Sequence, residues 1–177
     1  MTVSAGSLAV SGAGLLTSGT VTVNGATAVL TLGTTSQSVG GFRLADGVVE
    51  NGTLSATSFG LESGLVSAVL NGTAAVTKTT SGMVTLSGAN ALSGAMEILA
   101  GTLAVSGAGL LTSGSVTVNG VGAVLALGNT SQSVGAFRLA EGVVESGTLS
   151  ALSFGLESGL ISAVLSGGAP VTKGTSG

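Results

Sequence analysis

The segment MVTLSGANALSGAMEILAGTLAV, residues 83–105, sets the pattern from which the fold is predicted. Apolar and polar side chains alternate over residues 84–87, 96–98 and 102–105. A period of two residues is typical of a half-buried β-strand. Turn-forming residues separate the three runs, because Gly and Asn tolerate the backbone angles that tight turns need. The segment therefore predicts three short strands joined by turns.

The same segment resembles the autotransporter-associated β-strand repeat. The resemblance is carried by TLSGAN at residues 85–90, Ser-Gly at 93–94 and GTL at 101–103, with the family's spacing. Ala-Leu at 91–92 replaces the usual Thr-Tyr, and Ala-Met at 95–96 stands where Gly-Thr is commoner. The resemblance implies a right-handed parallel β-helix in a bacterial passenger that is secreted or attached to the outer membrane.

The chain is internally duplicated. LAVSGAGLLTSG at residues 8–19 recurs at residues 103–114, an offset of 95 residues. The offset holds without a gap from Met1/Met96 to Gly82/Gly177, with about four in five aligned positions identical. We therefore divide the chain into a first unit, residues 1–95, and a truncated second unit, residues 96–177, within one continuous domain. We expect both units to belong to a longer tandem array.

A shorter period lies inside each unit. Strand-like segments recur with an average step of about 19 residues, which is typical of one solenoid coil. One series begins near Leu8, Val29, Val48, Val66, Val84 and Leu103, and a second near Val21, Phe42, Leu54, Val76 and Met96. The spacing predicts an all-β parallel β-solenoid with about five coils in each 95-residue unit.

Antiparallel hairpins in a β-sandwich are the alternative. Asn-Gly pairs at residues 24–25, 51–52, 71–72 and 119–120 are two-residue hairpin signals. The same dipeptides also make tight corners between solenoid faces. The regular coil spacing and the long repeat favour the corner interpretation.

The two units allow the direction of the side chains to be predicted. Alternation places six pairs of identical side chains inside. These are Leu8/Leu103, Val10/Val105, Val21/Val116, Val23/Val118, Leu30/Leu125 and Leu32/Leu127. Positions that differ between the two units, such as Thr31/Ala126 and Thr20/Ser115, are predicted to point outward.

Composition excludes several classes of function. Only 6% of the 177 residues are charged, the net charge is −3, and Cys and His are absent. Without His or Cys, no Ser-His-Asp or Cys-His arrangement is possible and a Zn site is disfavoured. The net charge also leaves no basic face for nucleic acid. No apolar run reaches the roughly 18 residues that a membrane-spanning helix needs. We expect a protein that is not an enzyme, with no cofactor and no catalytic, cofactor-binding or metal-binding residues.

The best candidate for a carbohydrate or Ca²⁺ groove is Arg43 with Asp46 and Glu50. The second copy, Arg138 with Glu141 and Glu145, replaces Asp by Glu, so a surface ion pair at a turn is favoured. Phe42 and Phe59 are 17 residues apart and are expected to stack in the core rather than on a sugar. Thr20 and Thr22 do not recur on every coil, which disfavours ice binding.

These observations predict a structural or adhesive segment of a bacterial cell-surface or secreted β-solenoid. Low charge on the outward positions leaves little repulsion between rods, so we expect the chain to bind itself, laterally or end to end. Glycans on a host or neighbouring cell are a second class of partner. The alternative is a carbohydrate-binding or carbohydrate-cleaving β-helix.

Overall fold

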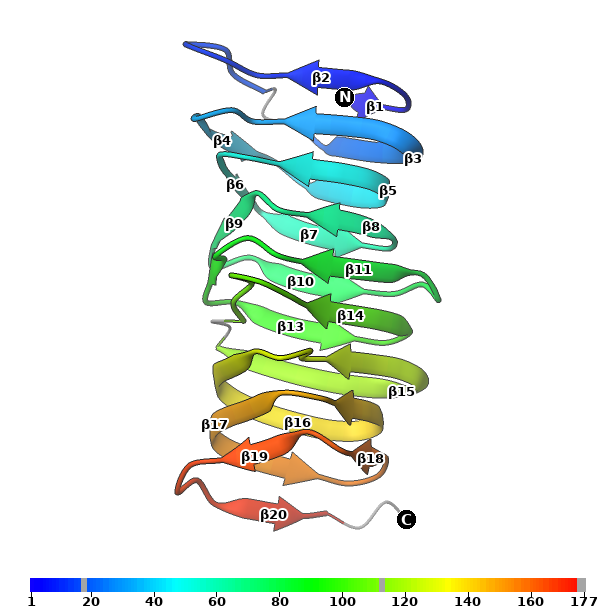
Figure 1. Ribbon diagram of the computed structural model, residues 1–177, viewed down its shortest axis with the longest axis vertical. Coiled ribbons are helices and arrows are strands. Elements are labelled where there is room, and N and C mark those ends of the chain that lie inside the picture. Colours follow the sequence, from blue (N-terminus) through cyan, green and yellow to red (C-terminus); the bar gives the residue numbers. More distant parts are fainter. Residues whose placement is uncertain (17–18, 112–113, 175–177) are drawn as a thin grey trace.

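The computed structural model describes residues 1–16, 19–111 and 114–174. Residues 17–18 and 112–113 of the duplicated segment, and the last three residues of the second unit, lie outside the described part. The chain forms a right-handed parallel β-solenoid of about nine coils, without a helix among the described residues (Figure 1). The predicted fold class is confirmed.

Each coil has three faces, named here in the order in which the chain passes along them. Long strands bend around corners and contribute to more than one face, because Gly and Asn allow the turn without ending the ladder. Face one contains five whole strands: β1 (Thr2–Val3), β7 (Ser58–Leu61), β10 (Ala75–Lys78), β13 (Ala95–Ile98) and β20 (Val171–Lys173). It also contains the starts of β3 (Val21–Thr31), β5 (Phe42–Glu50) and β15 (Ser115–Ala126), the middle of β16 (Ser131–Glu145) and the end of β17 (Thr148–Leu156).

Face two carries the first series of predicted strands, and face three was not predicted. Face two contains β2 (Ser7–Ala9), β8 (Gly64–Val66), β11 (Met83–Leu86), β14 (Gly101–Val105), β18 (Leu160–Ile161) and the ends of β3, β5, β15 and β16. Face three contains β4 (Ser36–Val39), β6 (Thr53–Ala56), β9 (Val69–Gly72), β12 (Ala91–Leu92), β19 (Val164–Ser166) and the starts of β16 and β17.

The hydrogen-bonded register confirms five coils for a full 95-residue unit. On face one, Val21 pairs with Phe42, and the ladder continues through Phe59, Val76 and Met96 to Val116. The steps are 21, 17, 17, 20 and 20 residues, which together span the 95-residue unit. Leu54 was wrongly assigned to this series, because it lies in β6 on face three, while Phe59 occupies the predicted place.

All the strand pairs in the described part of the chain are parallel, so the Asn-Gly dipeptides form corners and not hairpins. Asn51 and Gly52 adopt φ values of 60° and 55°, and Ser146 and Gly147 repeat this left-handed pair in the second unit. The pairs at 24–25 and 119–120 lie within β3 and β15, at irregularities in the register. The solenoid therefore turns at these positions while its backbone ladders continue.

The core is a narrow column of aliphatic and aromatic side chains between the three faces. The predicted inward residues are buried, except that Leu8 on the first coil is half-buried. Phe42 and Phe59 stack edge to face with ring centroids 6.2 Å apart, and Phe137 and Phe154 repeat the contact at 6.1 Å. The prediction that these rings belong to the core is confirmed.

Candidate functional site

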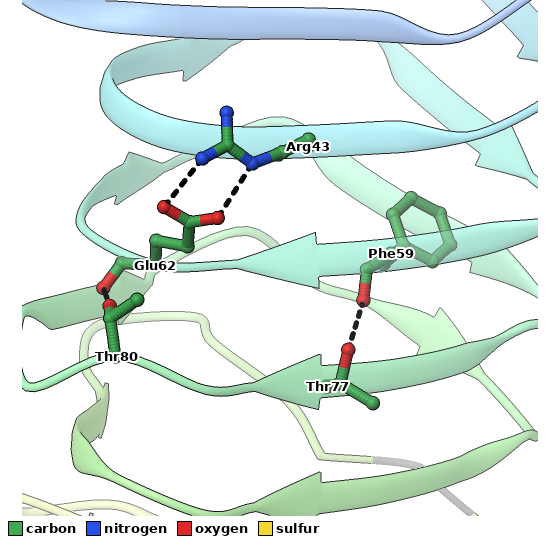
Figure 2. Close-up of polar contacts among 5 residues, drawn as sticks. All are labelled: Arg43, Phe59, Glu62, Thr77 and Thr80. Carbon is green, nitrogen blue, oxygen red and sulfur yellow. Dashed lines mark hydrogen bonds and ion pairs between the residues drawn. The ribbon is translucent and has the colours of Figure 1, made fainter.

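The candidate cluster of Arg43, Asp46 and Glu50, which the sequence disfavoured against a surface ion pair, is not assembled. Arg43 instead donates two hydrogen bonds to the Glu62 carboxylate on the next coil, from Nε at 2.6 Å and Nη2 at 2.8 Å (Figure 2). Asp46 Oδ1 accepts a hydrogen bond from the Gly47 amide, 2.8 Å long. Glu50 Oε1 accepts a 2.7 Å hydrogen bond from Thr31 Oγ1 on the preceding coil. The three side chains therefore serve separate local contacts.

The second unit repeats the ion pair. Arg138 Nε and Nη2 each lie 2.8 Å from an oxygen of Glu157. Both arginines are nearly half exposed on the outer surface of face one, at 46% and 48% for their side chains. Exposed ion pairs contribute about 0–1 kcal/mol, although the bidentate geometry places these at the favourable end. The expectation of a surface ion pair holds, with Glu62 and Glu157 as partners that were missed.

Glu62 also links a third coil through its backbone. The Glu62 carbonyl accepts a 2.9 Å hydrogen bond from Thr80 Oγ1, and a parallel contact joins Thr77 Oγ1 to the Phe59 carbonyl at 3.5 Å (Figure 2). These side chains therefore reinforce the stacking of successive coils. Among the described residues, no group of three or more Asp, Glu, His or Cys side chains is arranged to hold a metal ion.

Lys78 is the one charged side chain that is fully buried among the described residues. It occupies an inward position of face one, in register with Leu61 and Ile98. Its ammonium donates to the Thr80 carbonyl and, at 3.0 Å, to the Ala100 carbonyl. Burial lowers the pKa of Lys78, and the charge of Glu62 opposes this effect in part. No role was predicted for Lys78 from the sequence. Its apolar register partners, Leu61 and Ile98, are the signal that places it inside.

We expect Lys78 to make stability depend on pH under alkaline conditions. Because the pKa is lowered in the folded state, the unfolded chain binds more protons between that pKa and the ordinary lysine value of about 10.4. The free energy of unfolding should therefore rise with pH across this window. Urea denaturation of the wild type and of Lys78→Met at several pH values from 7 to 11 measures the effect. Equal slopes in the two proteins would contradict it.

Two buried glutamines form matched polar sites at the start of face three. Gln132 Oε1 accepts a 2.7 Å hydrogen bond from the Leu111 amide, and Nε2 donates to the Gly109 carbonyl at 3.0 Å and to Thr130 Oγ1 at 2.8 Å. Gln37 makes the same three contacts one unit earlier. In the coil before each glutamine, the described residues 10–16 and 106–111 form no face-three strand. The amide side chain therefore satisfies backbone groups that a strand would otherwise have paired.

Asn90 performs a similar task and also closes the predicted turn at residues 88–90, where its amide donates a 2.8 Å hydrogen bond to the Gly88 carbonyl. Its side chain is buried, with Oδ1 accepting from the Leu70 amide at 2.9 Å and Nδ2 donating to the Leu110 carbonyl at 3.3 Å. Neither Gly88 nor Asn90 has a positive φ. Gly88 is needed for close packing, because a Cβ there would lie 2.2 Å from the Ala68 carbonyl oxygen. Both residues therefore serve contacts between coils.

We expect Gln132→Leu to lower the free energy of unfolding by about 2–3 kcal/mol, because buried backbone groups lose their partners. The matched variant Gln37→Leu should cost less. Leu16 is half-buried whereas Leu111 is 1% exposed, so water can reach the backbone of the first coil more easily. Urea denaturation compares the two variants, and amide hydrogen exchange at Leu111 should accelerate only in Gln132→Leu. An equal cost in both would contradict this account.

Comparisons with known protein families, curated protein sequences and solved structures find no match to this chain. The described residues contain no helix that is long and apolar enough to cross a membrane. The resemblance of residues 83–105 to the autotransporter-associated repeat therefore remains a prediction from the sequence.

Proposed function

We propose that this chain is a structural segment of a bacterial cell-surface or secreted protein, acting as a stiff rod that binds other rods. The observation that carries the proposal is the in-register stacking of five coils for each 95-residue unit, repeated in the second unit. Parallel strands lie about 4.8 Å apart, so each full unit adds about 24 Å of length. Added units lengthen such a rod without changing its cross-section, as a stalk or fibre requires.

The stiffness of the proposed rod follows from its internal contacts. Continuous backbone ladders, stacked phenylalanines and the ion pair between Arg43 and Glu62 all join one coil to the next. Bending the solenoid would stretch these contacts on one side. A protein segment that projects or spaces other parts of a protein needs this stiffness. Catalysis would instead need reactive side chains that converge on one site.

The surface chemistry supports self-association in the same proposal. Charged residues are 6% of the chain, and two of the outward charges on face one, Arg43 and Arg138, are neutralised by Glu62 and Glu157. Little long-range repulsion therefore opposes the approach of two rods. The bacterial surface location rests on the resemblance of residues 83–105. Surface glycans are a second proposed partner. This proposal has less support, because the side chains of Arg43, Asp46 and Glu50 make separate contacts and do not form one binding groove.

Sedimentation velocity over a wide range of protein concentration tests the proposal. We expect an elongated particle whose weight-average sedimentation coefficient rises with concentration. A compact frictional ratio would contradict the rod. A strictly monomeric protein at the highest concentration would contradict the self-association.

A further inference from the structure

Face three changes its construction once in each unit. β4, β6, β9 and β12 form one parallel ladder on successive coils. On the next coil, residues 106–111 form no strand, and face three resumes at residues 131–134 of β16, which pair with residues 148–151 of β17. Within these described ranges, no backbone ladder joins residues 106–111 to residues 131–134. We call this boundary, and its counterpart between residues 10–16 and β4, the face-three seam.

A glutamine side chain spans the seam in both units. Gln132 Oε1 accepts a hydrogen bond from the Leu111 amide at 2.7 Å, and Nε2 donates to the Gly109 carbonyl at 3.0 Å. Gln37 makes the matching contacts with the coil that precedes it. By comparison, four register pairs join β4 to β6 on the following coils. One rotatable side chain therefore stands where a strand ladder joins the other coils of this face.

The other two faces continue through the same boundary without interruption. On face one, residues 95–98 pair with residues 115–118. On face two, residues 101–104 pair with residues 123–126. The coils on either side of the seam are therefore joined by backbone ladders on two faces and by the Gln132 amide on the third.

We propose that the face-three seam is a hinge, at which the rod bends by opening face three while faces one and two stay paired. Hydrogen bonds from one rotatable side chain are easier to break than a strand ladder, and regions with few such contacts open locally at low free energy. Leu111 is 1% exposed and packs in the core, which limits how far the seam opens. The inference goes beyond the proposed function, because it places the flexibility of the rod at one point in each unit, or about every 24 Å.

Two pairs of spin labels that span the same coils test the hinge, because the chain contains no Cys and cysteines can be introduced singly. Ser38→Cys/Ser133→Cys places labels at exposed positions of face three, on the two sides of the seam next to Gln132. Thr22→Cys/Thr117→Cys places them on face one of the same two coils. Five coil steps, or about 24 Å, separate the residues of each pair.

We expect the Thr22/Thr117 pair to give one narrow distance distribution. The Ser38/Ser133 pair should give a broader distribution, with a shoulder longer by about 5 Å, or one strand spacing. Equally narrow distributions for the two pairs would overturn the hinge. Equally broad distributions would overturn its position on face three. This comparison uses the wild-type core, so it does not depend on how a core variant folds.

Replacing the bridging side chain tests its role in the hinge. Gln132→Leu removes both hydrogen bonds across the seam, so it should increase the share of the longer Ser38/Ser133 distance and leave Thr22/Thr117 unchanged. Gln37→Leu is the matched control and should change neither distribution, because Gln37 contacts the coil before Ser38, outside the labelled span. Circular dichroism checks that both variants are folded. A shoulder that Gln132→Leu does not increase, or that Gln37→Leu increases equally, would overturn the assignment of the hinge to Gln132.

Discussion

Replacing Phe42 with Ala is expected to lower the free energy of unfolding by about 3–5 kcal/mol. Phe42 is 2% exposed and contacts Phe59 edge to face at an interplanar angle of 61°. The three backbone ladders around the core hold the neighbouring residues in register, so the surrounding coils have little freedom to close the cavity. Urea denaturation followed by circular dichroism at about 218 nm measures the change as a lower midpoint of unfolding.

The chain provides two controls for this prediction. Arg43→Ala changes the adjacent outward residue and should cost no more than about 1 kcal/mol. Phe137→Ala removes the equivalent ring, which is also 2% exposed and contacts Phe154 at 6.1 Å. It should cause a loss similar to that of Phe42→Ala. A cost for Phe42→Ala as small as that of Arg43→Ala would show that the ring is not a core residue.

Gly64→Ala is expected to cost about 3 kcal/mol or more, because it combines backbone strain with a steric clash. Gly64 has a φ of 119°, which side-chain-bearing residues rarely adopt. A Cβ at this position would lie 2.3 Å from the Gly47 carbonyl oxygen on the preceding coil. The coils can accept the methyl group only by moving apart at the corner between faces one and two. Urea denaturation should therefore show a strongly reduced midpoint.

Gly60→Ala is the matched control for Gly64→Ala, four residues earlier in the same coil. Gly60 has no positive φ, and the nearest atom to an added Cβ is the Phe42 carbonyl oxygen at 3.8 Å. Gly within a strand is destabilising by about 0.5–1 kcal/mol relative to Ala, so this change should be neutral or slightly stabilising. Equal losses in both variants would contradict the close approach of coils at Gly64.

The regular parts of the fold were predictable because they repeat locally. Alternation over residues 21–23 and 30–32 indicated which side chains point inward, and the duplication indicated that the same rule applies 95 residues later. The 17-residue spacing of Phe42 and Phe59 predicted their stacking. These features depend on period-two patterning and on the length of a coil, both of which can be counted in the sequence.

Polar inward residues could not be predicted in the same way. Alternation predicts that a polar side chain points outward, yet Gln37, Lys78 and Asn90 are buried. Their hydrogen bonds reach backbone groups about one coil away, and nothing next to them in the sequence indicates those partners. The third face was missed for this reason, since its short strands include Gln37 and adjoin Asn90.

The candidate site was predicted from neighbours in the sequence, whereas the solenoid brings together residues one coil apart. Arg43 was grouped with Asp46 and Glu50, but its partner Glu62 lies 19 residues away. Arg138 and Glu157 keep the same separation in the second unit. Searching for opposite charges at the coil period would have found both pairs.

Distances between spin labels on face one test the stacking of the coils most directly. Thr22, Thr77, Thr117 and Thr172 belong to one outward column, so cysteines introduced there present labels in the same direction. Five coil steps separate residues 22 and 117, and also 77 and 172, which predicts about 24 Å for both pairs; eight steps predict about 38 Å between 22 and 172. Distances that grow in proportion to the number of coils would support the solenoid. A distance between residues 22 and 172 that equals or falls below the distance between 22 and 117 would contradict it.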